Sequence, residues 1–417
     1  MFIILGEFIF SRRLPMLFTK FATLAVALLS MPPFLVFLFT SHKSNNLMPL
    51  LVLRGSLPQT LSEWRAQGRP IDHNTSSSLW LTPLFSTFFR KQGYRLWKLR
   101  NFIQAIPPDE TCPIRTFNYV ALYGGNITQS FFIDRHIHFP ARTIHNQDIL
   151  IRLASVEGDA WGDQYIQALQ RLSMGRSSYE VLNPTLPVLN RLTLDRFHFV
   201  VFPLVFTVSR LPWFYDIGEM LDFITQLCQG VQYCHQKRVA HRDIALSNIL
   251  CNFAGGFVTP TNRPGDPVHR FRSQFPIRYY ITDWEWAAVF DENSALSDCT
   301  VIGLPEDRTP ARYSRPVARE MLSSEPYSPF QTDIFHLGKL FQGYLGGELS
   351  SYLVKENGDD ALKSIIKKLL SLFDLMTAED AFDRPTAAVV VSAVQEVVEE
   401  ARAAGILHLY VGSKPHC

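Results

Sequence analysis

Apolar residues spaced three and four positions apart predict two helices in the chain. One covers Gly218–Gln236, where the apolar positions are Met220, Ile224, Leu227 and Val231. The other covers Asp163–Met174, where they are Ile166, Leu169 and Leu172. Side chains at this spacing lie on one face of a helix, so each helix is expected to pack that face against a core.

Short runs of β-branched and aromatic residues predict strands. Phe197–Phe202 is such a run, and Pro203 follows it. Proline ends a ladder of backbone hydrogen bonds because it has no N–H to donate. Asp148–Arg152 is a second run, and the apolar pair Ile249-Leu250 is a third. We expect a small sheet over residues 117–153.

The N-terminal pattern is different, because Phe21–Thr40 carries no charged residue. About twenty apolar residues can cross a bilayer as a helix, although Pro32 and Pro33 would kink it. Three alternatives stay open. They are a membrane anchor on a protein that faces the cytoplasm, a signal peptide that starts near Met16, and an over-extended gene model. The apolar count favours the anchor.

The charge balance does not indicate a nucleic-acid partner. The chain of 417 residues has a formal net charge of +2 and no long run of like charge. Its 6 cysteines include no C-x-x-C pair, which argues against a zinc site and for reduced, buried thiols. The length suffices for one large domain with an N-terminal extension.

The segment Val239–Leu250 carries the main chemical signal. It reads V-A-H-R-D-I-A-L-S-N-I-L, in which H-R-D is followed by four residues and an asparagine. This pattern resembles the catalytic loop of the eukaryotic protein kinase superfamily. The resemblance implies that Asp243, preceded by Arg242, accepts the proton of an attacking hydroxyl group. It implies that Asn248 holds the metal that bridges the phosphates of ATP.

Further landmarks of that family follow in the same order. Asp283, in the run T-D-W-E, stands at the position of the D-F-G aspartate that binds magnesium. Asp333 resembles the aspartate that braces the catalytic loop, and Arg384 resembles the arginine that pairs with the A-P-E glutamate. That glutamate position holds Val317 in this chain, and Glu320 is a candidate substitute.

The phosphate-binding part of the pattern is altered. The chain has no G-x-G-x-x-G loop within residues 117–153, where the family would place it, and Arg152 stands where the family carries a lysine on the phosphates. Arginine keeps the charge but replaces a compact ammonium by a planar fork. The helix expected over Asp163–Met174 contains no glutamate to pair with this cation. Asp163 and Gln164 are the nearest candidates, and the sequence does not choose between them.

Three other positions also depart from the family. Ala245 stands where serine/threonine kinases carry a phosphate-contacting lysine, and Ser247 stands where tyrosine kinases carry an arginine. Neither substrate class is therefore matched. Glu285 replaces the glycine of D-F-G, which removes backbone freedom at that point.

The resemblance implies an α+β, two-lobed protein-kinase-like fold with a small β-rich N-lobe and a large, mostly helical C-lobe. The run Trp213-Phe214-Tyr215 and the long insertion ahead of Asp283 are similar to those of the divergent protein-kinase-like proteins of fungi. We expect an apolar segment at 1–40, an extension on or near the N-lobe at 41–115, the kinase-like domain at 116–405 and a tail at 406–417.

The function implied is transfer of the γ-phosphoryl group of ATP, with Mg²⁺, to a protein hydroxyl. The expected catalytic residues are Asp243, Asn248 and Arg242. The expected cofactor and metal residues are Arg152, Asp283 and Asn248. A second hypothesis is a pseudokinase that acts as a scaffold or allosteric partner, which the altered positions favour. A third is a membrane-anchored small-molecule kinase on the same fold, although Pro316 and Arg384 favour the protein-kinase branch.

Overall fold

The computed structural model describes residues 57–66, 78–101, 104–108, 115–123, 131–133, 136–208, 213–255, 272–273, 275–305, 313 and 315–411. The apolar segment Phe21–Thr40, for which we expect a membrane anchor or a signal peptide, lies outside these residues. Of the helices that the structure does describe, none is both long enough and apolar enough to cross a membrane.

The N-terminal part is built on a five-stranded antiparallel sheet in the order β1-β6-β7-β9-β8. Its strands are β1 (Tyr94–Leu96), β6 (His138–Thr143), β7 (Asp148–Val156), β8 (Asn190–Leu194) and β9 (Phe197–Pro203). β7 and β9 contain the runs predicted as strands, and they pair with each other. The edge strand β1 precedes residue 117, where we expected the sheet to begin.

Aromatic residues of the preceding segment cover this sheet. The segment contains α4 (Leu61–Ala66), η1 (Leu79–Leu81) and α5 (Pro83–Lys91). Trp64 in α4 lies edge-on to Phe197 of β9, with ring centroids 5.5 Å apart, and Trp80 in η1 lies edge-on to Phe199 at 5.5 Å. Both tryptophans are fully buried. Rings of this size bury a large apolar area, so α4 is held firmly beside the sheet.

Helix α6 (Ala160–Leu172) packs against both the five-stranded sheet and a turn that belongs to the candidate site. It contacts β7 on one side and the turn η5 (Trp284–Trp286) on the other. Gly162 allows this approach, because a Cβ at that position would collide with Ser155 of β7. The helix predicted over Asp163–Met174 is thus present, shifted by a few residues.

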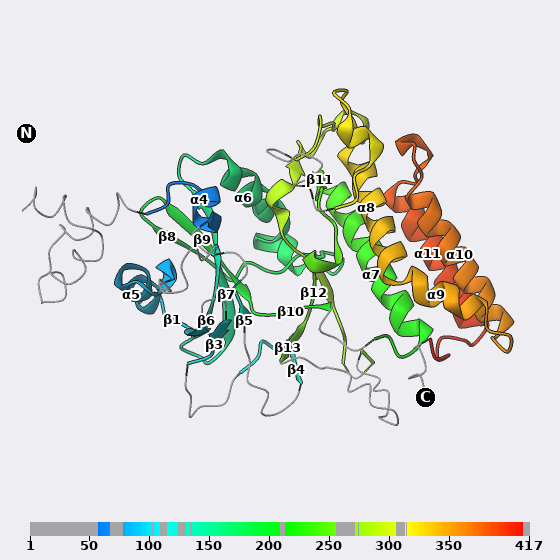
Figure 1. Ribbon diagram of the computed structural model, residues 1–417, viewed down its shortest axis with the longest axis horizontal. Coiled ribbons are helices and arrows are strands. Elements are labelled where there is room, and N and C mark those ends of the chain that lie inside the picture. The colour runs from blue at the N-terminus through cyan, green and yellow to red at the C-terminus, as the bar shows by residue number, and fades with distance from the viewer. Residues whose placement is uncertain are drawn as a thin grey trace, which may run out of the picture. The chain divides into compact units, whose positions relative to one another are not determined.

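The C-terminal part is helical and consists of α7 (Ile217–Gln236), α8 (Pro329–Tyr344), α9 (Gly346–Leu353), α10 (Asp360–Met376) and α11 (Ala387–Ala403). In Figure 1, α7, α8, α10 and α11 run side by side, and contacts join α7 to α11 and α10 to both α8 and α11. Asp216 caps α7 by accepting a hydrogen bond from the N–H of Glu219. The helix predicted over Gly218–Gln236 is α7.

Short strands form the other sheets that the structure describes. β10 (Phe206–Thr207), β12 (Ile249–Cys251) and β14 (Tyr279–Ile281) form one sheet, and β11 (Val239–Ala240) pairs with β15 (Ala288–Val289). In two further sheets, β13 (Phe253–Gly255) pairs with β4 (Ala121–Tyr123), and β3 (Gln104–Ile106) pairs with β2 (Lys98–Asn101) and β5 (Phe131–Phe132). The other 3-10 turns are η2 (Gly175–Tyr179), η4 (Leu246–Asn248), η6 (Leu296–Asp298), η7 (Arg319–Leu322) and η8 (Ala381–Asp383).

The pairing of β12 with β14 sets the geometry of the site. Ile249 pairs with Ile281, so the loop that ends at residue 248 and the turn that begins at residue 283 leave neighbouring strand ends. The two-lobed α+β fold predicted from the sequence is confirmed, with a β-rich N-terminal lobe and a helical C-terminal lobe.

Candidate functional site

Asp333 on α8 fixes the backbone at the start of the 241–248 loop. Its Oδ2 accepts a 2.8 Å hydrogen bond from the N–H of His241, and its Oδ1 accepts one of 2.7 Å from the N–H of Arg242. Burial opposes the charge of this carboxyl group, but the hydrogen bond from His235 and the charges around it lower the pKa of Asp333 below its ordinary value. The brace expected at Asp333 is present.

Arg242 serves this loop through its backbone. Its φ is +64°, in the left-handed region that costs a non-glycine residue about 1–2 kcal/mol. The bonds to Asp333 and a 2.6 Å hydrogen bond from the Tyr313 hydroxyl to the Arg242 carbonyl hold this conformation. The guanidinium donates to the carbonyl of Gly303 at 3.3 Å. The left-handed residue turns the chain, so that Asp243 follows in a fixed orientation.

Asp243 is buried, and each of its oxygens has a donor. Oδ1 accepts a 2.8 Å hydrogen bond from Nε of Arg315, and Oδ2 accepts one of 2.8 Å from Nδ2 of Asn248. The N–H of Asp243 donates to Nδ1 of His241 at 3.1 Å. Nε2 of His241 lies 2.9 Å from the carbonyl of Thr282, so the ring carries its proton on Nε2 and links the loop to the next strand.

Asn248 lies beside Asp243, as the spacing of five residues predicts. Its Nδ2 donates to both the carbonyl (2.9 Å) and the carboxylate (2.8 Å) of Asp243. Its own carbonyl accepts a 2.9 Å hydrogen bond from the N–H of Thr282, the residue before Asp283. Since Nδ2 is committed to Asp243, the amide oxygen Oδ1 is the atom of Asn248 that is suited to hold a cation.

Asp283 faces Arg152 across the site. Both terminal nitrogens of Arg152 donate to Oδ1 of Asp283, at 3.2 Å from Nη1 and 3.1 Å from Nη2. Asp283 has a φ of +69°, a conformation that aspartate tolerates better than most residues, and it directly precedes η5. Two residues that the sequence assigns to the phosphates and the metal are therefore in direct contact.

Glu285 gives Arg152 a second carboxylate partner. Nη2 of Arg152 also donates to Oε1 of Glu285, and Oε2 of Glu285 pairs with Arg65 of α4. Glu285 is buried, so these two cations neutralise a carboxylate that is withdrawn from water. From the sequence we noted Glu285 only as a replaced glycine. The structure shows that it provides the charge that we had expected on the Asp163–Met174 helix.

Helix α6 contributes an aromatic ring in place of that carboxylate. The guanidinium carbon of Arg152 lies 4.1 Å from the ring centroid of Tyr165, which is a cation–π distance. Burial works against the charge of Arg152, but Tyr165, Glu285 and Asp283 together raise its pKa above its ordinary value. Neither Asp163 nor Gln164 has a recorded contact with Arg152 among the described residues. Tyr165 was not predicted from the sequence, because a tyrosine on an amphipathic helix is typical of a core position.

Arg315 also lies at the site, although the sequence analysis did not single it out. Besides its 2.8 Å bond to Asp243, its Nη2 donates to the hydroxyl of Ser247 at 3.1 Å. Ser247 and Ala245 are the two positions where the family carries a cation within the loop. In this chain a cation reaches the same place from a segment 72 residues away in the sequence.

Glu320 occupies the place expected for the glutamate missing at Val317. Nη1 of Arg384 lies 2.5 Å from Oε1 of Glu320, and Nη2 lies 3.0 Å from Oε2, which makes a two-pronged ion pair. The Arg384 side chain has no exposed surface, and that of Glu320 is 14% exposed. This pair ties η7 to the residues that open α11.

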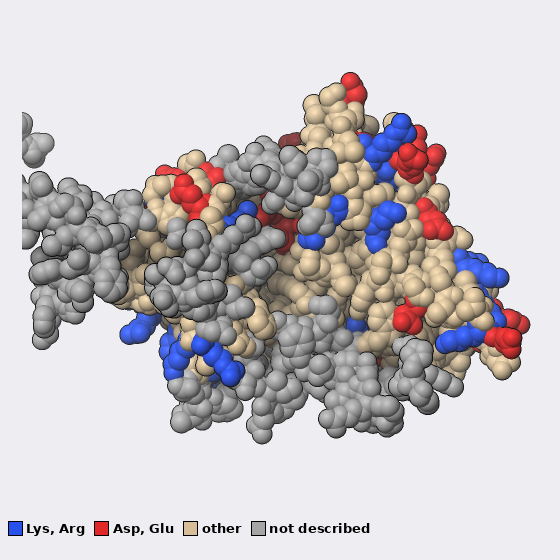
Figure 2. Space-filling view, in the orientation of Figure 1, with Lys and Arg blue, Asp and Glu red and all other residues tan. Residues whose placement is uncertain are grey.

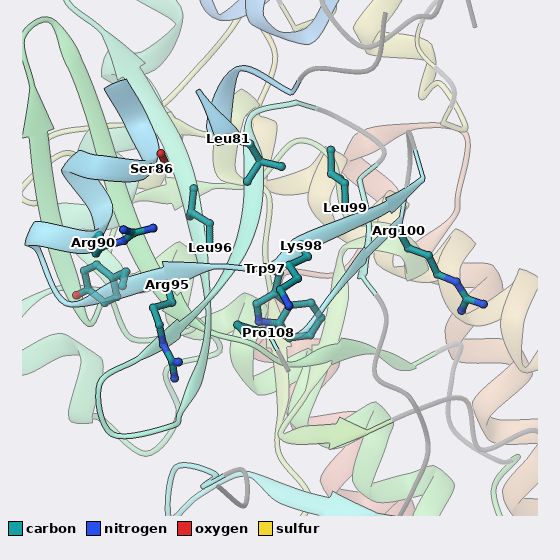
Figure 3. A pocket seen from close by; sticks show the side chains of 11 residues that line it. Leu81, Ser86, Arg90, Arg95, Leu96, Trp97, Lys98, Leu99, Arg100 and Pro108 are labelled. Carbon is teal, nitrogen blue, oxygen red and sulfur yellow. The ribbon is translucent and has the colours of Figure 1, made fainter. Parts of the chain in front are cut away.

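The described part of the molecule contains a cavity next to the site and a larger cavity away from it. One of about 150 Å³ adjoins the site and is lined by Gln164, Arg242, Glu285, Trp286, Ile302, Leu304 and Pro305. The other, of about 710 Å³, is shown in Figure 3 and is lined by β1, β2 and α5 residues that include Arg90, Arg95, Lys98 and Arg100. Basic side chains are visible on this side of the molecule in Figure 2. None of the site residues described above lines the larger cavity.

The described residues of the site provide some, but not all, of the oxygen ligands that a magnesium ion requires. Over the described residues, no group of three or more His, Cys, Asp or Glu side chains is arranged to hold a metal ion. One carboxylate, Asp283, and one amide oxygen, of Asn248, are the kinds of oxygen ligand that Mg²⁺ accepts. Magnesium sites of this kind depend on substrate phosphates for further ligands, so an incomplete protein ligand set fits Mg²⁺ bound together with a nucleotide.

Residues 207–401 match the family described as "Protein kinase domain". No curated protein matches the chain. The matched range includes Asp243, Asn248, Asp283, Asp333 and Arg384, whereas Arg152 and its sheet precede it.

Proposed function

Because this chain belongs to the protein-kinase-like superfamily, we propose that its site binds ATP with Mg²⁺ and transfers the γ-phosphoryl group to a protein hydroxyl. The observation that carries this proposal is the contact of Asp243 with Asn248 in one braced loop. The turn bearing Asp283 leaves the neighbouring strand end. The residue types needed for a base and for metal ligands are thus brought to one place.

Asp243 would act on the incoming hydroxyl group. As the hydroxyl oxygen forms a bond to the γ-phosphorus, the bond from that phosphorus to the oxygen shared with the β-phosphate breaks, and ADP leaves. The hydroxyl proton passes to a carboxylate oxygen of Asp243. The hydrogen bonds from Asn248 and Arg315 orient this carboxylate, and such positioning is the main contribution of the protein to phosphoryl transfer.

Asn248 and Asp283 would hold the magnesium ion. When bound, Mg²⁺ supplies positive charge that neutralises the phosphates. Arg152 would place a second positive charge at the phosphates from β7. Its present partners, Asp283 and Glu285, keep that guanidinium charged and fixed within the site.

A second candidate function is that of a pseudokinase scaffold, and one observation favours it. Both key carboxylates are already paired with arginines, Asp243 with Arg315 and Asp283 with Arg152. A protein that uses only its folded surface would keep such pairs for stability. In that case nucleotide would bind weakly or not at all, and no phosphate would be transferred.

Nucleotide binding by the full chain separates the two candidates at their first step. The thermal unfolding midpoint is measured with ATP, with and without Mg²⁺, for wild type and for Asp283→Asn. A ligand that binds the folded state raises the midpoint as its concentration exceeds the dissociation constant. We expect a magnesium-dependent rise that Asp283→Asn removes. No rise at millimolar ATP would favour the scaffold.

A further inference from the structure

Two positions after Asp243 in the loop, Ala245 and Ser247, carry no charge, and the guanidinium of Arg315 reaches Ser247 from another segment. Ala245 and Ser247 are the two loop positions at which protein kinases carry a basic residue. In the structure, the guanidinium of Arg315 contacts Oδ1 of Asp243 at 2.8 Å and Oγ of Ser247 at 3.1 Å. We propose that Arg315 positions Asp243 and supplies the positive charge beside the transferred phosphoryl group. This inference rests on the proposed phosphoryl transfer.

The residues flanking Arg315 show that its place is built into the fold. Two residues before it, the Tyr313 hydroxyl donates to the carbonyl of Arg242 at 2.6 Å. One residue after it, the carbonyl of Pro316 lies 3.1 Å from Nε2 of the buried His336 on α8. Both neighbours are thus bonded to the loop or to the helix that braces it. The backbone that carries Arg315 is fixed on either side of the guanidinium.

The guanidinium retains donors for a substrate. Nε and Nη2 are used on Asp243 and Ser247, while Nη1 donates no hydrogen bond within the described part of the chain. The Arg315 side chain is 21% exposed, against 4% for that of Asp243, so the cation opens to solvent where the carboxylate does not. A planar guanidinium matches two phosphoryl oxygens, and its charge does not depend on pH.

The same contacts allow an opposite role, in which Arg315 blocks Asp243 as a built-in inhibitor. The two roles predict opposite results when the side chain is removed. A positioning cation raises the rate of transfer, so its loss lowers kcat. A blocking cation lowers that rate, so its loss raises kcat.

The test uses the full chain with magnesium-ATP and a protein or peptide hydroxyl acceptor. Arg315→Ala and Arg315→Lys are compared with wild type for kcat, for the KM of ATP and for the thermal midpoint. Arg319→Ala is the matched control, because Arg319 is in the same segment but 79% exposed and 3.6 Å from its partner Glu379. We expect Arg315→Ala to lower kcat about 100-fold, as for the loss of one preorganised donor. The KM of ATP should change less than about twofold, and Arg315→Lys should recover part of kcat.

Each outcome decides the inference. An Arg315→Ala protein as active as wild type, or more active, would overturn it while leaving the phosphotransferase function in place. A wild type that binds magnesium-ATP but transfers no phosphate would overturn both. If Arg315→Ala lowers the thermal midpoint, the comparison moves to Arg315→Lys, which keeps the charge. In that case a kcat of Arg315→Lys below that of Arg319→Ala supports the inference, and equal values contradict it.

Discussion

Nη2 of Arg152 lies 3.1 Å from Oδ1 of Asp283, and the same nitrogen donates to Glu285. One guanidinium on β7 therefore binds two carboxylates of the same turn. Glu285 in turn pairs with Arg65 of α4. Consecutive ion pairs thus connect α4, which precedes the sheet, to Asp283 in the site. Glu285, which replaces the glycine of D-F-G in the sequence, therefore takes part in two of these ion pairs.

The coupling between Arg65 and Glu285 can be measured in a double-mutant cycle. Glu285→Gln removes one of the two carboxylates that pair with buried Arg152, and Asp283 remains. We therefore expect this substitution to lower the free energy of unfolding by about 1–3 kcal/mol. Arg65→Ala should cost less, because Arg65 is partly exposed and Glu285 keeps Arg152. The double variant should be less destabilised than the sum of the two, by about 0.5 kcal/mol or more.

A matched exposed carboxylate gives the control for that cycle. Glu292 pairs with Arg171 but is 65% exposed, so Glu292→Gln should change the unfolding free energy by less than about 0.5 kcal/mol. Denaturant unfolding of the four proteins and the control provides the values. Strict additivity of Arg65→Ala and Glu285→Gln would show that α4 and the site are not coupled.

The ion pair of Glu320 with Arg384 should matter for stability. Glu320→Ala leaves a fully buried guanidinium without its carboxylate, and we expect a loss of about 3 kcal/mol. Glu379→Ala provides the comparison, since the Glu379–Arg319 pair is exposed on both sides and should contribute less than about 1 kcal/mol. Thermal or urea unfolding measures both. Equal effects of the two substitutions would contradict the structural role given to Glu320.

His336 predicts an acid sensitivity of the fold. Burial lowers the pKa of His336 below its ordinary value of 6.5, although the nearby Asp333 and Asp243 oppose this shift. The unfolded chain therefore takes up the proton at a higher pH than the folded chain does. The contribution of neutral His336 to stability is complete above about pH 6.5 and declines as pH falls below that value.

A substitution at His336 tests this sign. Unfolding free energy is measured from about pH 7 to pH 5 for wild type and for His336→Gln, with the exposed His408→Gln as control. We expect the unfolding free energy of the wild type to fall as the pH is lowered across this range. The change of unfolding free energy with pH should be smaller for His336→Gln and unaltered for His408→Gln. An unchanged slope in His336→Gln would assign the acid sensitivity to other groups.

Local patterns in the sequence predicted the elements that position the site. Spacing of apolar residues predicted α7, and β-rich runs predicted β7 and β9, because periodicity reports directly which face of an element is buried. The motif around Asp243 and Asn248 fixed their proximity, since both side chains emerge from one short loop. Asp333 was predicted by family order alone.

Two contacts between distant segments of the site were not predicted. Arg152 and Glu285 are 133 residues apart, and Arg315 and Asp243 are 72 apart. A charged residue in a turn is most often solvated, so nothing in the sequence distinguishes Glu285 or Arg315 from surface positions. The partners of Glu285 and Arg315 are determined by which segments lie side by side in the folded chain. Only the folded chain shows that Glu285 pairs with Arg152 and that Arg315 pairs with Asp243.

The measurement that tests the central claim most directly is transfer of the γ-phosphoryl group from ATP by full-length wild type and by Asp243→Asn. The substitution keeps the side-chain shape but removes the proton acceptor, and Asp291→Asn, at an exposed position, is the control. We predict magnesium-dependent transfer by the wild type and by the control. Asp243→Asn should lower the rate of transfer by about 100-fold or more while the protein remains folded. Equal transfer by wild type and Asp243→Asn would contradict the account, and so would a wild type that binds magnesium-ATP without transferring phosphate.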